Sequence, residues 1–278
     1  MSLWERYWYA EETRVTPDGV FYLAQAEGDA VPFPYRLRGL LPRLLGPSRL
    51  RWHRMNSISL VVLSAGLWVY TGSPLAILFL LCFPLLSFWR NAPILQDLPA
   101  LALAVWAANV LGWNTSAGIV FALLAGLVNE KAPLFAALYA WSPFPLIGYL
   151  STGISYLGTR EGPMPERITA QPEMCEEMEY VLAHPFRSAQ RFLRSRWGDG
   201  GLWIQPWGGM VLALFNPSFQ LGATTAVAFG MCFTATDSLR MMVWALPVVA
   251  AAVAGLQWEA AVAALALSWF WGRNGKCW

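Results

Sequence analysis

The strongest constraint on the fold of this chain is the separation of apolar runs from charged linkers between Met55 and Trp271. Apolar runs of about 15 residues alternate with short linkers, and nearly every charged residue lies in a linker. Hydrophobic residues make up 56% of the sequence and charged residues 13%. That composition leaves too little polar surface for a water-exposed domain, whereas lipid accommodates apolar surface. The sequence therefore predicts an all-α fold, a polytopic transmembrane bundle of short helical hairpins with an interfacial N-terminal segment.

The predicted helices are short for a membrane span. A 15-residue helix is about 22 Å long, against a hydrocarbon core of about 30 Å. Some helices must therefore extend into flanking polar residues or be re-entrant, and the expected number of spans is about eight to ten. The predicted runs are Asn56–Tyr70, Pro74–Trp89, Leu98–Trp113, Ser116–Val128, Pro133–Leu157, Leu202–Phe215, Gln220–Ala235, Met241–Leu256 and Ala260–Trp271.

The linkers alternate between uncharged and charged, and this alternation predicts a topology. All 19 Lys and Arg residues lie in the charged set. If Pro133–Leu157 doubles back at Ser142–Pro145, every basic residue falls on one face, which the positive-inside bias identifies as cytoplasmic. We then expect a bacterial inner-membrane protein with both termini in the cytoplasm. If Pro133–Leu157 crosses only once, Gly158–Gly201 and all that follows change sides.

We place two transmembrane helical groups at residues 55–157 and 202–272, followed by a short polar tail at 273–278. Two polar regions lie outside these groups. Residues 1–54 are rich in Arg and are expected to lie at the interface, where Leu enters the acyl boundary and Arg reaches anionic headgroups. Residues 158–201 form a polar loop that contains an amphipathic helix. Arg187, Arg191 and Arg194 share one face of this helix and are candidate phosphate or lipid-headgroup ligands.

Small residues recur at four-residue spacing in two of the runs. One set is Gly118, Ala122 and Gly126, and the other is Gly222, Ala226 and Gly230. Such a stripe lets helix backbones approach closely in lipid, so we expect compact helix packing at these positions.

Three arginines of the N-terminal segment, Arg36, Arg38 and Arg43, are candidate phosphate ligands. They lie beside aromatic and proline residues, and guanidinium groups bind phosphate through two parallel hydrogen bonds. The alternative is that they bind lipid headgroups without a defined pocket. Glu130 and Lys131 lie between two apolar runs and are candidate site residues, Glu130 as a catalytic carboxylate and Lys131 as a phosphate ligand. The alternative is a solvated linker.

The remaining ionisable residues carry weaker indications. Asp237 and Arg240 are three residues apart at a helix start and are interpreted as a structural ion pair, and Asp97 similarly marks the start of a helix. Neither His nor Cys spacing indicates a metal site, and no cofactor motif is present, although a divalent metal stays open. The net charge of +2 argues against nucleic acid as a partner.

Several short motifs resemble those of bacterial membrane proteins related to GT-C glycosyltransferases. They are Asp18-x3-Tyr22-x5-Gly28, Pro32-Phe33-x-Tyr35-Arg36 and Leu40-x-Pro42, with Asn129-Glu130-Lys131 and Ala235–Arg240 further along. In that class an acidic residue at the membrane face activates the acceptor, and basic residues hold the phosphate of a polyprenyl-linked sugar. The resemblance implies these roles for Asp18 and Arg36. Here no apolar run precedes Asp18, and the predicted topology places it on the cytoplasmic side, where such enzymes do not place theirs.

The leading hypothesis is thus a GT-C-like glycosyltransferase, or a degenerate relative, that uses a polyprenyl-phosphate-linked sugar. The alternative is a membrane component without enzymatic activity that docks a protein partner or a further copy of itself in a larger assembly. A transporter or channel is a third hypothesis, but the runs contain few polar residues to line a pathway.

Overall fold

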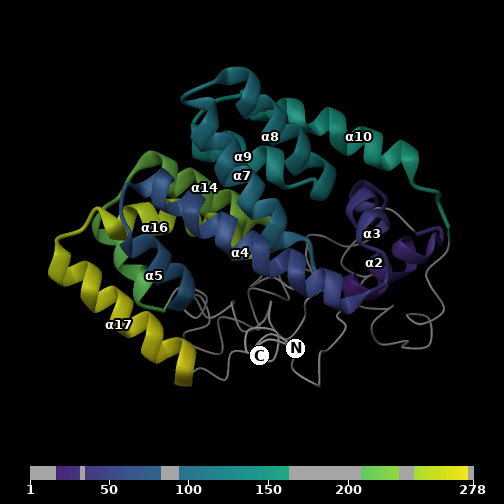
Figure 1. Ribbon diagram of the computed structural model, residues 1–278. Coiled ribbons are helices and arrows are strands. Elements are labelled where there is room, and N and C mark those ends of the chain that lie inside the picture. Colours follow the sequence, from purple (N-terminus) through teal and green to yellow (C-terminus); the bar gives the residue numbers. More distant parts are fainter. Residues whose placement is uncertain (1–16, 32–34, 83–93, 163–207, 232–240, 275–278) are drawn as a thin grey trace. The chain divides into compact units, whose positions relative to one another are not determined.

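The computed structural model describes residues 17–31, 35–82, 94–162, 208–231 and 241–274, with the backbone alone for residues 17, 18, 208–210 and 269–274 (Figure 1). This part of the chain is helical and contains no strand, apart from an isolated parallel bridge between Val31 and Glu161. The predicted all-α class is confirmed. Among these described residues, no helix combines the length and apolar character needed to cross a membrane.

The chain divides into two compact units, each described here by itself. Unit 1 comprises Met1–Gly66 and Ser87–Pro172, and unit 2 comprises Leu67–Leu86 and Glu173–Trp278. The α-helices of unit 1 are α2 (Pro17–Glu27), α3 (Leu40–Leu45), most of α4 (Arg49–Thr71), α7 (Asp97–Leu111), α8 (Thr115–Val128), α9 (Ala132–Ala140) and α10 (Gly148–Gly158), and its 3-10 helices are η1 (Tyr35–Arg38) and η2 (Phe144–Ile147). Those of unit 2 are α5 (Leu75–Cys82), η3 (Gly208–Phe215), α14 (Phe219–Met231), η5 (Val243–Ala245), α16 (Leu246–Ala254) and α17 (Trp258–Asn274).

Helices α7 to α10 run alternately away from and back toward one end of unit 1. Short turns join α7 to α8 and α8 to α9, and α8 packs against both α7 and α10 (Figure 1). Helix α9 ends at Trp141, whose φ of 49° is left-handed, and the chain then returns through η2 and α10. The doubling back predicted for Pro133–Leu157 is therefore confirmed. As a result, Asp97, Glu130 and Thr159 meet at one end of unit 1, which we call the polar end.

The first stripe of small residues permits the closest packing in unit 1. A Cβ atom on Gly126 would overlap the carbonyl oxygen of Gly148, and one on Gly148 would overlap the carbonyl oxygen of Ala122. Thr152 donates a 2.9 Å hydrogen bond to the carbonyl oxygen of Gly126 across this contact. The expected close approach is confirmed here. In the second stripe, Cβ atoms on Gly222 and Gly230 would have open space around them, so that stripe makes no such contact.

The burial pattern of α10 is inverted relative to that of a helix that faces water. Its polar residues Ser151, Thr152 and Ser155 are at most 5% exposed, whereas Leu150 and Ile154 are each 65% exposed. In water, an amphipathic helix buries its apolar face and exposes its polar one. Exposed apolar side chains also line the outer faces of α4 and α8, including Ile58, Val61, Val120 and Leu124.

Unit 2 packs α16 and α17 against η3 and α5. Its core contains the fully buried Phe79 and Trp244, and the Asn216 side chain donates a 2.9 Å hydrogen bond to the carbonyl oxygen of Ala252. Gln220 of α14 donates to the Tyr70 hydroxyl. These contacts join the loop at Asn216 to α16 and α14 to the end of α4, but gather no cluster of charged groups among the residues described.

Predicted and observed helices coincide best where an apolar run is bounded by capping residues. The run Ser116–Val128 corresponds to α8, which starts one residue earlier because the Asn114 side chain accepts a hydrogen bond from the Ala117 amide. Helix α4 begins at Arg49, seven residues before the predicted Asn56, because its first two turns carry arginines that the apolar pattern excluded. The apolar pattern located this helix but not its charged beginning.

Candidate functional site

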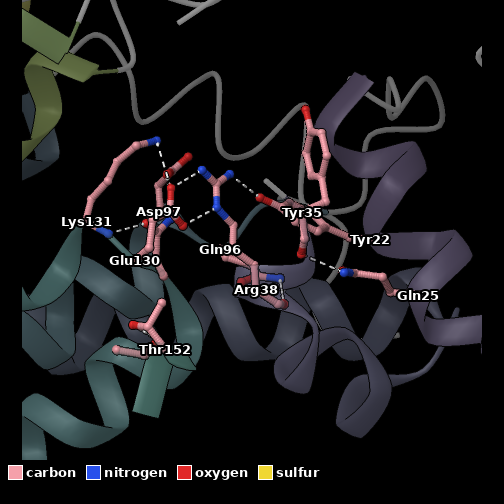
Figure 2. Close-up of polar contacts among 11 residues, drawn as sticks. Tyr22, Gln25, Tyr35, Arg38, Gln96, Asp97, Glu130, Lys131 and Thr152 are labelled. Atoms are coloured by element: carbon pink, nitrogen blue, oxygen red, sulfur yellow. Dashed lines mark hydrogen bonds and ion pairs between the residues drawn. The ribbon is translucent and has the colours of Figure 1, made fainter. Parts of the chain in front are cut away.

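The polar end of unit 1 brings together charged and polar side chains from segments far apart in the sequence. They come from α2, from η1, from the residues that start α7 and from the turn between α8 and α9 (Figure 2). The start of α7 and the turn between α8 and α9 are helix termini, where backbone groups lack helical partners and polar side chains are common. Two parts of the site are therefore built where helices terminate.

An ion pair between Arg38 and Glu130 lies at the centre of this cluster (Figure 2). Both carboxylate oxygens of Glu130 accept hydrogen bonds from the guanidinium group, through Nε and Nη2. The third nitrogen, Nη1, donates to the Tyr22 hydroxyl at 2.9 Å. The side chain of Arg38 is only 7% exposed and that of Glu130 19%. All three guanidinium nitrogens thus have protein partners.

The acidity of Glu130 reflects this pairing. Burial alone would raise the pKa of its carboxyl group, but the charge and hydrogen bonds of Arg38, with the nearby charge of Lys131, lower it to about 2. Glu130 therefore stays ionised at neutral pH. A carboxylate held this way is a poor proton acceptor, so the geometry favours a positioning role over the catalytic role expected for Glu130.

Lys131 and Asp97 extend the cluster. The ammonium group of Lys131 lies 3.9 Å from the Glu130 carboxylate, and its side chain is 15% exposed. Asp97 is buried at the start of α7, as its predicted helix-initiating position requires, and accepts a 3.5 Å hydrogen bond from Asn129. Glu130 and Lys131 are thus packed into the protein, and the interpretation of this segment as a solvated linker is wrong.

The backbone of η1 is fixed by side chains from three helices or helix starts. Gln25 of α2 donates to the carbonyl oxygen of Tyr35 at 2.7 Å, and Gln96 donates to that of Arg38 at 3.1 Å. Ser155 of α10 donates to the carbonyl oxygen of Arg36 and accepts from the amide of Gly39. Stacking of Phe21 on Tyr35, with ring centroids 3.8 Å apart, adds an apolar contact. The segment that carries Arg36 and Arg38 is therefore rigidly held.

Arg36 and Arg43 tie the N-terminal segment to the end of α10. Arg36 donates to the carbonyl oxygen of Thr159 at 3.0 Å and to Glu161 at 2.7 Å, and its guanidinium group lies 4.0 Å from the centre of the Tyr156 ring. Arg43 is exposed and donates to the carbonyl oxygen of Gly158 at 2.6 Å. Of the three predicted phosphate ligands, Arg36 and Arg38 are largely used within the protein, and Arg43 alone is exposed.

The site residues predicted from the sequence thus fall into four groups. Arg43 of α3 is exposed and bonds to the carbonyl oxygen of Gly158. Arg36, Arg38, Glu130 and Lys131 lie at or beside the polar cluster. Asp18 is in the first turn of α2, the helix that supplies Tyr22 and Gln25 to the cluster. The remaining candidates lie outside the described residues: Arg187, Arg191, Arg194, Asp237 and Arg240.

Sequence reasoning missed the glutamines and tyrosine that support the cluster. Gln25 and Gln96 are each fully buried, and the amide oxygen of each has no hydrogen-bond partner. No spacing rule marks an isolated glutamine as a ligand of a distant backbone. A usable signal was present for Tyr22, since its position in the Asp18-x3-Tyr22 motif sets it one helical turn after the acidic residue.

The cluster contains carboxylates and cations in near balance rather than a set of metal ligands. Within the described residues, no group of three or more His, Cys, Asp or Glu side chains is arranged to hold a metal ion. The arrangement can position a rigid, positively charged segment at the end of a helix bundle. In comparisons with known proteins, no family model, curated protein or solved structure matches this chain.

Proposed function

We propose that this chain is an integral membrane protein whose helices pack in lipid. The observation that carries the proposal is the inverted face of α10, where Ser151 and Thr152 point into the protein while Leu150 and Ile154 point out of it. Lipid solvates exposed aliphatic side chains, and buried hydroxyl groups can bond to backbone carbonyl oxygens across helices. Ser151 and Thr152 do so to Leu123 and Gly126 of α8.

Charge distribution in unit 1 supports the same proposal. No charged residue occurs between Leu98 and Asn129 or between Ala132 and Thr159. The ends of these helices opposite the polar end instead expose Trp113, Trp141 and Phe144, at 68%, 55% and 56%. Exposed aromatic rings without nearby charge are typical of segments that enter a membrane.

The proposal is tested by placing charge on the outer face of α10. The double variant Leu150→Arg and Ile154→Arg should lose membrane integration, because an arginine in the hydrocarbon costs about 2.5 to 3.5 kcal/mol. Wild-type protein should remain in the membrane pellet after alkaline carbonate extraction, and the variant should not accumulate there. Asp29→Arg, at an exposed position in the polar region, is the matched control and should behave as wild type. If the double variant integrates normally, this face does not contact lipid and the proposal fails.

Within the membrane, we further propose that the polar end binds the phosphate of a lipid-linked sugar, as GT-C-like enzymes do. The supporting observation is that two of the motifs that carry the resemblance meet at Arg38. Tyr22 of the Asp18-x3-Tyr22 motif bonds to Arg38, and Arg38 pairs with Glu130 of the Asn129-Glu130-Lys131 motif. These two motifs, which are far apart in the sequence, therefore contribute to one cluster.

The proposed roles follow from the contacts. Glu130 and Arg38 act as positioning residues, because their charges neutralise each other. Asp18 remains the candidate that activates an acceptor, and Arg36 and Lys131, which lie beside the cluster, remain the candidates that hold the donor phosphate. The enzyme proposal thus depends on Asp18 and not on Glu130.

Substitution of Asp18 distinguishes the enzyme from its alternative. Asp18→Asn should abolish a glycolipid or lipid-linked sugar product, while the variant protein still integrates into the membrane. The product is measured in lipid extracts from cells that lack the chain or overproduce it. Asp29→Asn, at an exposed position just after the end of α2, controls for a general change of charge. A glycolipid profile that does not change with overproduction or with Asp18→Asn removes the enzyme proposal. The alternative is then a membrane component without enzymatic activity, in which Arg36 and Arg38 serve only to dock the N-terminal segment.

A further inference from the structure

The exposed face of α4 changes from charged to apolar within two turns. Arg51 and Arg54 are exposed in its first turns, and Ile58 and Val61, on the same face, are each 64% exposed. Over the same stretch, His53, Asn56 and Ser59 are buried. A helix in water has no reason to expose isoleucine and valine while it buries asparagine and serine. The change between Arg54 and Ile58 therefore marks a boundary between two solvents.

The outer face of α10 changes in the opposite order along the chain, from apolar to charged. This face exposes Ile154 at 65% and Leu157 at 81%, and the first charged residue after the helix, Arg160, is exposed. The two boundaries are linked through α3. Arg43 of α3 bonds to the carbonyl oxygen of Gly158, and Trp52 of α4 donates to that of Gly46, just after α3.

The described arginines of unit 1 differ in direction. Arg36 and Arg38 point into the protein, with side-chain exposures of 12% and 7%. Arg43, Arg51, Arg54 and Arg160 are exposed at the two boundaries. Leu44, the residue after Arg43, is 70% exposed. Guanidinium groups next to exposed leucine suit a surface with anionic headgroups above an acyl layer.

We infer that Arg43, Arg51, Arg54 and Arg160 form a band that binds the headgroups of anionic phospholipids, with the apolar faces of α4 and α10 in the adjoining acyl layer. The inference rests on the proposed membrane location and adds to it the lipid class and the residues that contact it. It also assigns lipid binding to the outward arginines rather than to Arg36 and Arg38. Each arginine near an anionic surface contributes about 1 kcal/mol, which corresponds to about fivefold in affinity.

The test uses the full chain, purified in a neutral detergent and titrated with short-chain phosphatidylglycerol, phosphatidylcholine or inorganic phosphate. Wild-type protein should bind phosphatidylglycerol in a salt-sensitive manner, and both other probes at least about tenfold more weakly. Changing all four arginines to Gln should weaken phosphatidylglycerol binding by about several hundredfold, whereas changing all four to Lys should retain most of it. Because Arg43 and Arg51 also bond to backbone carbonyl oxygens, Arg160→Gln alone is the second variant, with an expected loss of about fivefold.

The inference is overturned if the fourfold Gln variant binds phosphatidylglycerol like wild type, or if phosphatidylcholine binds equally well. It is also overturned if inorganic phosphate binds as tightly as phosphatidylglycerol, since that would indicate a discrete anion site. Carbonate extraction separates this failure from failure of the membrane proposal. Protein that resists extraction but does not prefer the anionic lipid refutes the band alone, whereas protein released by carbonate refutes the membrane location.

Discussion

At the scale of single residues, the largely buried Arg38–Glu130 pair is one of the contacts that hold the N-terminal segment. A buried ion pair contributes little by itself, but removing one partner leaves an uncompensated charge in a poorly solvated place. The cost of breaking such a pair is about 3 to 5 kcal/mol. Because Gln25 and Gln96 fix the same segment through its backbone, loss of the pair should loosen η1 without unfolding α7 to α10.

The pH dependence of stability should report this pair directly. The pKa of Glu130 falls from 4.5 to about 2 on folding, so its stabilising contribution is complete above pH 4.5 and is lost as the pH falls from 4.5 toward 2. The full contribution is up to about 3 kcal/mol. Thermal unfolding in detergent should show wild type losing stability between pH 5 and pH 3 more steeply than Glu130→Gln does. Glu161→Gln, which removes an exposed partner of Arg36, is the control and should leave the wild-type slope intact. Equal slopes for wild type and Glu130→Gln would contradict the pairing.

The sequence identified the participants at this scale but not their partners. Arg38, Glu130 and Lys131 were all recognisable as charges in unusual surroundings. Their pairing depends on the path of the chain, because 92 positions separate Arg38 from Glu130. Local spacing carries no information about such a contact. The buried glutamines were missed for the same reason, since each bonds to the backbone of a segment that only the folded chain brings near.

At the scale of elements, the contact between α8 and α10 depends on glycine. Gly126→Ala and Gly148→Ala should each destabilise unit 1 by about 1 to 3 kcal/mol, because the added methyl group would overlap a backbone carbonyl oxygen of the neighbouring helix. Gly153→Ala is the matched control, since a Cβ atom there would meet nothing within 4 Å. It should stabilise the helix by up to about 1 kcal/mol. Thermal unfolding of the three variants in detergent measures the difference, and similar melting temperatures would refute the close packing.

The helices themselves were the most predictable part of the fold. Apolar runs bounded by Asn, Gly or Pro predicted α7 and α8. The α9–α10 hairpin was predictable because the turn at Ser142–Pro145 contains prolines, which interrupt a helix. The inverted face of α10 was not predicted. In an almost uniformly apolar run, the few hydroxyl groups do not reveal which side faces inward until the neighbouring helix is known.

At the scale of the whole molecule, the confinement of charge predicts which positions lie on one side of the membrane. The Gly162 amide donates to the carbonyl oxygen of Val31 at 3.3 Å, so residue 162 lies beside the N-terminal segment. In a chain with its four native cysteines replaced, Asp18→Cys and Arg160→Cys should react with a membrane-impermeant thiol reagent from the same side, since Arg160 is exposed next to this contact. Asn114→Cys, in the turn at the opposite end of α7 and α8, should not react from that side. Labelling of Asn114→Cys and Arg160→Cys from the same side would refute this arrangement.

The bridge between Val31 and Glu161 has a consequence for biosynthesis. The N-terminal segment leaves the ribosome first, yet its partners are made much later: Arg38 pairs across 92 positions, and Arg36 bonds to Thr159 across 123. At a synthesis rate of about 5 to 20 residues per second, Arg36 and Arg38 wait roughly 5 to 25 seconds for these groups. Arg36 and Arg38 therefore cannot make their final contacts until the turn after α8 and the end of α10 have been synthesised.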